Sequence, residues 1–474
     1  MPNLSRIDAF TYTANLIEFT MKPQIPFNKL KSVTSSKLLL ASVASLWIAL
    51  APAIGHAQTR LSETTWGGNG SDVAEGVAVA SDGASYVVGI TDSFTTDQFG
   101  NPSPRIFLVK FAPDGSLVWQ RIWNGTTVRG LGRTGVALGA GDSVYVTGVS
   151  TNNGNDAVLL KFDMNGTLLW ERTWGGPDSD ESLAVVAAPD GSAYIAGTAT
   201  SFGPSSSGLF IVKFDSLGNL VWQRISDGAA GNAVGIGPDG SVYAAGTTPR
   251  PDLIGNFDVV ALKITSDGNL VWQRTYSAGD VVDPRGGMTV ASDGSVYMAG
   301  AIQTVKANRA DIAALIVKLS TNGELLFDKQ FDGRSSEVAA GVAVAPDDGT
   351  VYVAGTTTSF GSGFQDAFVL HLVSTGKKLL NAVTWGGAGF EEGAGVGVNA
   401  GTVALAATTT NPPPYSLLDA SARLSSPRGT LAIVTGVLTT PAGISADPAA
   451  GAAIPNGTTV FGGNFEAALV RIAR

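Results

Sequence analysis

The chain has 474 residues, a formal net charge of −9, no cysteine and two histidines. Because 44% of its residues are hydrophobic and only 15% are charged, the composition is that of a folded protein and not of a disordered one. The acidic balance argues against nucleic acid as a partner, and the absence of cysteine excludes disulfides and cysteine-ligated zinc.

The first 57 residues read as an N-terminal extension with a secretory signal peptide. Three lysines lead into the apolar run 38–50, and Gly55 and Ala57 offer a small-residue cleavage site. We therefore predict cleavage near Ala57 and export to the periplasm, the cell surface or the exterior. The apolar run is shorter than the roughly 20 residues of a spanning helix, so no transmembrane anchor is expected after cleavage. Translation begins at either Met1 or Met21.

Residues 58–474 are expected to form one domain built from a repeat of about fifty residues. The clearest copy contains Asp190-Gly191, Tyr194, Lys213 and Trp222 in that order. A repeat of this period is typical of a solenoid, a propeller or an array. Each copy has four short apolar runs bounded by Gly, Asp, Asn, Ser and Pro, and none has helical periodicity. Four strands in each repeat predict the blade of an all-β propeller.

Two recurring residues allow the copies to be counted. A second-strand position holds Tyr86, Tyr145, Tyr194, Tyr243, Tyr297, Tyr352, Ala404 and Phe461, and a third-strand position holds Lys110, Lys161, Lys213, Lys263, Lys318, His371, Arg423 and Arg471. Both series predict a single propeller of eight four-stranded blades. Seven blades is the alternative, because the last two copies, over about 395–474, are degenerate.

The two ends of the repeat region are complementary. Residues 61–66 form a lone strand that ends at Trp66, as fourth strands end at Trp123, Trp174 and Trp385. The last repeat stops after its third strand, at Arg471. We therefore predict that the N-terminal strand completes the last blade, which would close the ring and remove its free edges.

Loop composition separates the two faces of the expected ring. Hairpins between strands one and two and between strands three and four carry Asp-Gly or Asn-Gly, which favour tight turns. Loops between strands two and three vary in length and content, with long examples at 91–105, 247–257 and 301–311. Variable loops on a rigid scaffold commonly carry function, so this face and its channel mouth are the predicted binding surface.

Two groups of residues on this face are candidate ligands. Acids that follow fourth strands could hold Ca²⁺, which takes six to eight oxygen ligands, although their spacing matches no EF-hand; the alternative is that they cap turns. These candidates are Asp72, Asp178, Asp180, Glu181, Glu391 and Glu392. Phenylalanines in the second-to-third-strand loops are candidates for carbohydrate stacking, namely Phe94, Phe202, Phe360 and Phe364.

The remaining chemically suggestive residues favour structural roles. His371 occupies the lysine position of its repeat, and no nucleophile-elbow motif accompanies it. The lysine series is expected to pair with acids of the same or the next blade, and the tyrosine and tryptophan series to pack between blades. The sequence thus predicts no catalytic constellation and no cofactor apart from the candidate Ca²⁺.

The pattern Trp-Gly-Gly, Asp-Gly-Ser-Val-Tyr-Val-Ala-Gly-Thr, Asp-Ala-Phe-Leu-Val-Lys-Phe-Asp and Gly-Asn-Leu-Val-Trp resembles the SBBP family of bacterial β-propeller repeats. The resemblance covers residues 64–386 well and 395–474 poorly. It implies a secreted or surface propeller without a general enzymatic activity. The expected function is therefore a monomeric, non-enzymatic scaffold that binds a protein or a glycan.

A second resemblance supplies the alternative. The segments 162–170 and 214–222 are similar to the tryptophan-docking motif of eight-bladed quinoprotein propellers. That resemblance implies a quinone- or calcium-dependent enzyme, although the vicinal cysteine pair common in those enzymes is absent from this sequence.

Overall fold

The computed structural model describes residues 60–127, 134–151, 154–205, 207–250, 257–283, 287–306, 309–361, 364–410 and 466–473. The chain divides into two compact units, Met1–Pro52 and Ala53–Arg474, and every described residue belongs to the second. The predicted signal peptide, Arg423 and Phe461 lie outside the described residues. Within the described ranges there are strands and no helix, so none that could cross a membrane.

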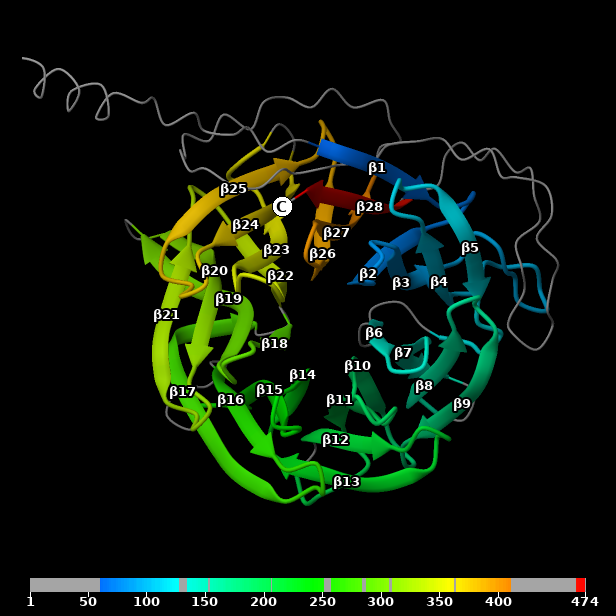
Figure 1. Ribbon diagram of the computed structural model, residues 1–474, viewed down its shortest axis with the longest axis horizontal. Coiled ribbons are helices and arrows are strands. Elements are labelled where there is room, and N and C mark those ends of the chain that lie inside the picture. Colours follow the sequence, from blue (N-terminus) through cyan, green and yellow to red (C-terminus); the bar gives the residue numbers. More distant parts are fainter. Residues whose placement is uncertain are drawn as a thin grey trace, which may run out of the picture. The chain divides into compact units, whose positions relative to one another are not determined.

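Four-stranded antiparallel sheets are arranged in a ring, as Figure 1 shows, and their inner strands line a central channel. Blade 1 comprises β2 (Asp72–Val79), β3 (Ser85–Thr91), β4 (Arg105–Phe111) and β5 (Leu117–Ile122). Blade 2 comprises β6 (Gly135–Gly139), β7 (Ser143–Ser150), β8 (Asp156–Asp163) and β9 (Leu168–Trp174). Blade 3 comprises β10 (Asp180–Ala187), β11 (Ala193–Ala199), β12 (Gly208–Phe214) and β13 (Leu220–Asp227).

The next three blades repeat this order. Blade 4 comprises β14 (Ala230–Ile236), β15 (Val242–Pro249), β16 (Phe257–Ile264) and β17 (Leu270–Asp283). Blade 5 comprises β18 (Met288–Val290), β19 (Val296–Lys306), β20 (Arg309–Leu319) and β21 (Leu325–Phe331). Blade 6 comprises β22 (Glu337–Val344), β23 (Val351–Thr357), β24 (Asp366–Leu372) and β25 (Leu379–Trp385). The end of β17 also pairs with β19, which joins the sheets of blades 4 and 5.

Blade 7 closes the ring with strands from both ends of the described chain. It comprises β26 (Glu391–Val398), β27 (Thr402–Thr409), β28 (Glu466–Ala473) and β1 (Arg60–Trp66). The lone strand β1 pairs antiparallel with β28, with Glu63 opposite Val470 and Trp66 opposite Ala467. The predicted closure of the last blade by the N-terminal strand is confirmed.

The prediction of eight blades is wrong, because the described strands form seven blades and the alternative of seven holds. In blade 7 Ala404 lies directly opposite Arg471 on the neighbouring strand. The sequence count had assigned these two residues to different repeats. Residues 411–465 intervene between β27 and β28, and they contain Arg423 and Phe461, the two positions that produced the eighth count.

A row of side chains crosses strands two, three and four of most blades. In blade 1 Tyr86 lies opposite Lys110, which lies opposite Trp119. Blades 2, 3 and 4 have the same Tyr–Lys–Trp row, and blade 5 has Phe327 in place of the tryptophan. The Lys110 ammonium lies 5.2 Å from the centroid of the Tyr86 ring, so the row contains a cation–π contact.

The same rows join each blade to the next. The Trp119 indole N–H donates to the Met164 carbonyl at 3.0 Å, in the turn between β8 and β9, and Lys110 donates to that oxygen at 3.3 Å. Arg121 donates to the Gly166 carbonyl at 2.8 Å in the same turn. Blades 2 and 3 form equivalent bonds, from Trp170 and Lys161 to Ser216 and from Trp222 and Lys213 to Ser266. The predicted packing of the aromatic series between blades is therefore seen directly.

Three of the five lysines of this series bond to a backbone carbonyl and not to the expected acid. Lys110, Lys161 and Lys213 donate to turn carbonyls of the next blade. Among the described lysines of this series, Lys263 is the one that forms a salt bridge, to Asp239 at 3.0 Å. Blades 1 and 3 have Asp82 and Asp190 at the position of Asp239, so their lysines bond to the turn carbonyl although an acid is present at that position.

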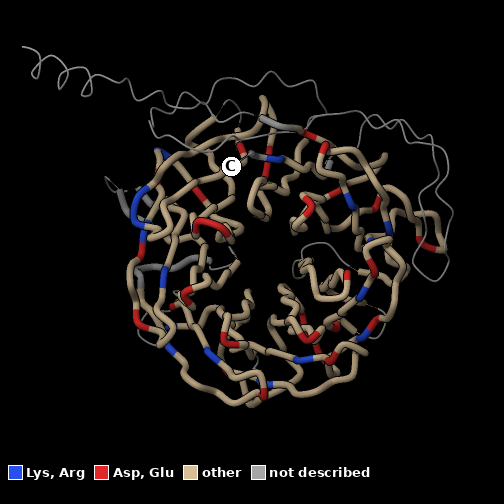
Figure 2. The backbone as a smooth tube through the Cα atoms, viewed as in Figure 1, with Lys and Arg blue, Asp and Glu red and all other residues tan. Residues whose placement is uncertain are grey.

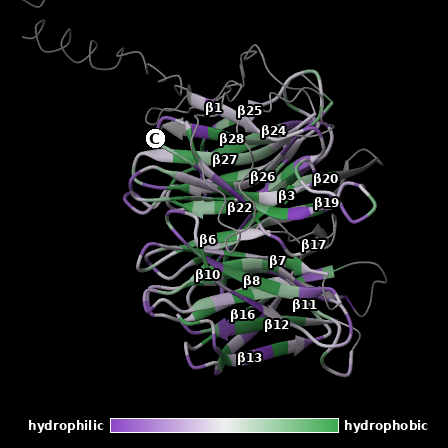
Figure 3. Cartoon of the chain, turned by 90° about the vertical axis from the view of Figure 1, so that its right-hand side faces the viewer, coloured by the Kyte–Doolittle hydropathy of each residue, from purple (hydrophilic) through white to green (hydrophobic). Residues whose placement is uncertain are grey.

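Apolar side chains lie within and between the sheets, and hydrophobic residues are concentrated in the strands in Figure 3. The innermost strands approach one another closely at small residues. A Cβ atom added to Gly341 would lie 3.0 Å from the Cα of Gly395, and one added to Gly395 would lie 3.5 Å from the Cα of Gly76. In each of these strands the register shifts just before the glycine, which marks a β-bulge facing the channel.

Candidate functional site

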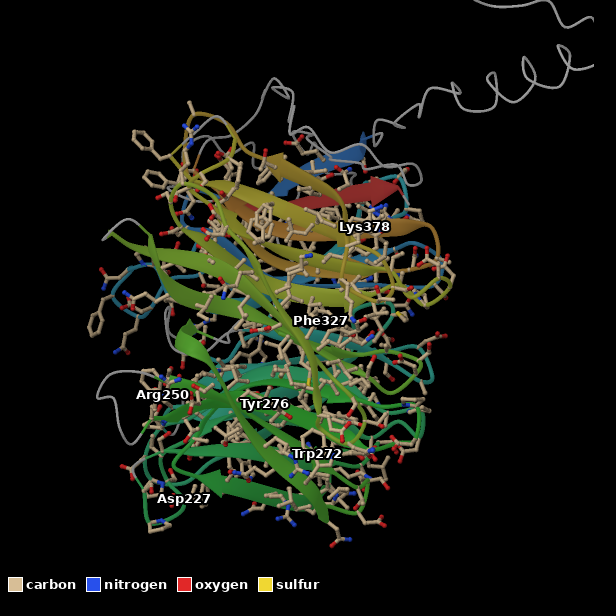
Figure 4. The ribbon with its side chains drawn as sticks, turned by 90° about the vertical axis from the view of Figure 1, so that its left-hand side faces the viewer. Asp227, Arg250, Trp272, Tyr276, Phe327 and Lys378 are labelled. Carbon is tan, nitrogen blue, oxygen red and sulfur yellow. The ribbon has the colours of Figure 1, made fainter. Side chains whose placement is uncertain are left out.

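The connecting segments divide between two faces of the ring. The hairpins between strands one and two and between strands three and four form the tight-turn face, and most have a glycine with positive φ, such as Gly191 (82°) and Gly218 (81°). The loops between strands two and three and those between blades form the variable-loop face. In Figure 4 Asp227 and Arg250 lie toward the variable-loop face and Lys378 toward the tight-turn face.

Several turns between blades are held by an acid at the start of the following inner strand. Each carboxylate accepts a hydrogen bond from the backbone N–H four residues earlier, and all four are fully buried. The pairs are Asp72 with Gly68 (2.7 Å), Asp180 with Gly176 (2.7 Å), Glu337 with Gly333 (2.6 Å) and Glu391 with Gly387 (3.0 Å). The turn-capping alternative therefore describes Asp72, Asp180 and Glu391.

The other three predicted calcium ligands lie near the surface. Asp178 and Glu392 are exposed, and Glu181 is half-buried and accepts a hydrogen bond from the Ser179 hydroxyl at 3.2 Å. The six acids are distributed over three separate blade junctions. In the part of the chain that the structure describes, no three His, Cys, Asp or Glu side chains form a group that could hold a metal ion. Calcium binding by these acids stays a prediction.

Two of the capping acids have a second carboxylate close by, from the preceding blade. A Cβ atom on Gly386 would lie 2.2 Å from Asp366 Oδ1 and 2.6 Å from Glu391 Oε2, so both carboxylates converge on this glycine. Asp156 and Asp180 converge on Gly175 in the same way. Burial raises the pKa of Glu391, and the negative charge of Asp366 raises it further.

The Asp366–Glu391 pair should make the stability of the protein depend on pH. Because the pKa of Glu391 is higher in the folded chain than the ordinary value of 4.5, folding favours its protonated form, and that contribution to stability is lost as pH rises through the folded-state pKa. Glu391→Gln keeps an oxygen for the turn and removes the titration. We expect its free energy of unfolding to rise relative to wild type between pH 4.5 and pH 8, as measured by urea titrations at each pH. A difference between the two proteins that does not change with pH would contradict this.

Three of the four predicted ligand-face phenylalanines pack against another aromatic ring. Phe94 packs on Trp66 with ring centroids 5.4 Å apart, and Phe202 stacks on Trp174 at 5.0 Å. Phe360 packs on Phe331 at 5.5 Å. Each of the three covers the ring that ends a neighbouring outer strand, so these side chains connect a variable loop to the blade edge.

The fourth, Phe364, is 73% exposed and stacks on Phe390, which is 52% exposed. The ring centroids are 5.5 Å apart and the planes differ by 12°. The backbone fixes this pair, because the Phe364 N–H donates to the Gly389 carbonyl at 3.2 Å and the Glu391 N–H donates to the Gln365 carbonyl at 2.9 Å. Two loops from different parts of the sequence thus present one rigid aromatic surface.

Sequence reasoning missed Phe390. It lies beside Glu391 and Glu392 at the start of β26, and only the carboxylates of that segment are candidate ligands from the sequence alone. A signal was present in the repeat itself, because Ser71, Ser179 and Ser336 precede the capping acids of other blades and Phe390 takes the place of serine here.

The inner strands enclose a cavity of about 170 Å³ in the channel. Its lining is mostly Gly, Ala and Val, with Thr134 and Asn232 as polar members and Glu75 as the charged one within the described lining. Glu75 accepts hydrogen bonds from the Thr134 N–H at 2.6 Å and from the Thr134 hydroxyl at 2.8 Å. The channel carboxylate is therefore engaged in joining blades 1 and 2.

His371 is buried in β24 and stacks on Tyr352 of the adjacent strand, with ring centroids 4.4 Å apart and planes 7° from parallel. The two residues occupy the Lys and Tyr positions of the row that other blades have. This placement agrees with the structural role predicted for the histidine.

Comparison with known proteins assigns no family to the chain. No family model matches the chain. It is 25% identical over 147 residues to the regulatory protein FlaEY of Caulobacter vibrioides, a match that covers 26% of this chain and 15% of that protein. The resemblance to the SBBP family stays a prediction.

Solved structures similar to this chain are β-propellers at low sequence identity. The Dos1 propeller is 12% identical, with a TM-score of 0.46, and the match covers 73% of this chain and 93% of that one. The propeller domain of the Trilobed protease from Pyrococcus furiosus is 11% identical (TM-score 0.42; 74% and 97% covered). The polysaccharide lyase Uly1 is 11% identical (TM-score 0.43; 86% and 90% covered). At these levels the likeness concerns the fold alone.

Proposed function

We propose that the chain is an exported, non-enzymatic propeller that binds a protein or glycan ligand through its variable-loop face. The exposed aromatic surface of Phe364 and Phe390 is the observation that carries this proposal. Paired large apolar side chains that are exposed and rimmed by polar residues are typical of interaction sites. The scaffold beneath them is rigid, because every blade is joined to its neighbours by buried aromatic and hydrogen-bonded contacts.

Charge and sequence support the rest of the proposal. Lys and Arg positions alternate with Asp and Glu positions around the ring in Figure 2, so the described chain has no run of basic positions of the kind that binds nucleic acid. Export rests on the apolar run after the N-terminal lysines. Membership of the SBBP family is part of the same proposal and rests on the repeat pattern.

A pair of surface variants tests the proposal. The protein, recovered from outside the cytoplasm and expected to begin near Gln58, is immobilised and exposed to envelope proteins and glycans. In the first variant residues 92–104 and 364–366 are replaced by Gly-Ser segments of equal length, and in the second Leu217 on the tight-turn face becomes serine. We expect the ligand to be lost only from the first variant, with the second as matched control. Equal retention by both variants would contradict the proposal.

A further inference from the structure

Other blades have different residues at the positions equivalent to Phe364 and Phe390. The Phe390 carbonyl accepts a hydrogen bond from the Thr410 N–H at 3.1 Å, and the carbonyls of Ser71, Ser179 and Ser336 accept the same bond in three other blades. Likewise the Gln365 carbonyl accepts from the Glu391 N–H as Asn155 accepts from Asp180, so Phe364 occupies the position of Gly154. At the junction of blades 2 and 3 the fold is therefore built with glycine and serine at these two positions.

Phenylalanine at both positions is thus not required to close a blade junction. The rings contact each other, and both remain largely in solvent, which leaves apolar area exposed without a folding benefit to offset it. Phe94, Phe202 and Phe360 on the same face each cover another aromatic ring, whereas the Phe364–Phe390 pair covers no further ring among the described residues. The pair is preorganised by the two backbone hydrogen bonds that tie its loops together, which lowers the entropic cost of binding.

The size of the surface favours a small ligand over a protein. A large aromatic side chain contributes roughly 150–250 Å² at most, so two half-exposed rings fall well short of the roughly 800 Å² that each partner buries in a standard protein interface. The rings are followed or flanked by polar side chains, Gln365, Thr410 and the exposed Glu392. A ligand with a flat apolar face and hydrogen-bonding groups along its edge would therefore be complementary to this surface.

We propose that Phe364 and Phe390 form a stacking platform for a neutral β-linked glycan whose pyranose rings have equatorial hydroxyls. Such a ring presents an apolar C–H face to the phenyl groups and directs its hydroxyls to the polar rim. The exposed Glu392 carboxylate disfavours an anionic sugar at the same place. This inference rests on the proposed function and adds the class of ligand and its position.

Calorimetric titration of the full-chain protein with cellohexaose, chitohexaose and hexagalacturonate tests the platform. The variants are Phe390→Ser, which installs the residue of three other blades, and Phe364→Ala. Phe99→Ala is the matched control, because Phe99 is 79% exposed in another variable loop. We expect a neutral hexamer to bind, each platform variant to weaken binding about tenfold or more, and the Phe99 variant to match wild type.

Other outcomes overturn the inference in distinguishable ways. Undiminished hexamer binding by Phe390→Ser and Phe364→Ala, with melting temperatures like that of wild type, would place the glycan elsewhere. Tighter binding of hexagalacturonate, or no binding of either neutral hexamer, would overturn the ligand class. If the envelope ligand of the preceding experiment were still lost with the variable loops, the proposed function would survive that failure.

Discussion

Replacing Trp119 with alanine is expected to lower the free energy of unfolding by about 3–5 kcal/mol, the range for deleting a large buried aromatic side chain. Trp119 is 6% exposed, and its ring contacts the turn of blade 2, where a Cβ atom on Gly166 would lie 3.1 Å from it. Its indole N–H also bonds to the Met164 carbonyl. The substitution therefore opens a cavity between two blades and leaves a turn carbonyl with one donor fewer.

The chain suggests the matched control for this prediction. Blade 5 has Phe327 at the equivalent position, and its ring packs on Gly376 of blade 6. We expect Trp119→Phe to keep most of the packing and to lose about 1 kcal/mol with the hydrogen bond. Urea titrations of both variants measure the difference. A loss below about 1 kcal/mol for the alanine variant would show that the tryptophans do not hold the blades together.

The sequence predicted the fold well because the repeat is carried by buried residues. Tyr86 and Lys110, which mark successive copies in the sequence, are direct cross-strand partners, and the equivalent residues pair in each of the following blades. The count failed where a long segment separates β27 from β28. Counting along the chain shows how many repeat-like segments exist. Only the pairing of strands, here Ala404 with Arg471, shows which segments belong to the same blade.

The site was less predictable, for a physical reason. Whether a phenylalanine is a ligand platform or a packing element depends on what covers it, and the covering residue comes from a different blade. Phe202 and Phe364 occupy comparable loops, but Trp174 covers the first ring and none of the described core covers the second. The acids show the same limit, because the sequence left calcium binding and turn capping both open, and it is the contacts in the fold that identify Asp180 and Glu391 as turn caps.

Removal of β1 is expected to lower the free energy of unfolding by more than the loss of one buried tryptophan between blades. In this strand Trp66 is buried against Phe107, with ring centroids 4.4 Å apart, and the Thr64 hydroxyl bonds to the Gly115 carbonyl of blade 1 at 2.9 Å. A chain that begins at Gly67 loses these contacts and the pairing with β28. We expect its free energy of unfolding to fall by more than the roughly 3–5 kcal/mol assigned to one buried tryptophan.

The shortened chain should also change its association state. Without β1, strand β28 presents unpaired backbone N–H and C=O groups at the edge of blade 7, and such an edge promotes strand pairing between molecules. A chain that begins at Arg60 keeps β1 and is the control. Light scattering coupled to size exclusion should show self-association only for the chain that begins at Gly67. If both chains stayed monomeric and equally stable, β1 would not be what closes the ring, and the contacts between blades 7 and 1 would suffice.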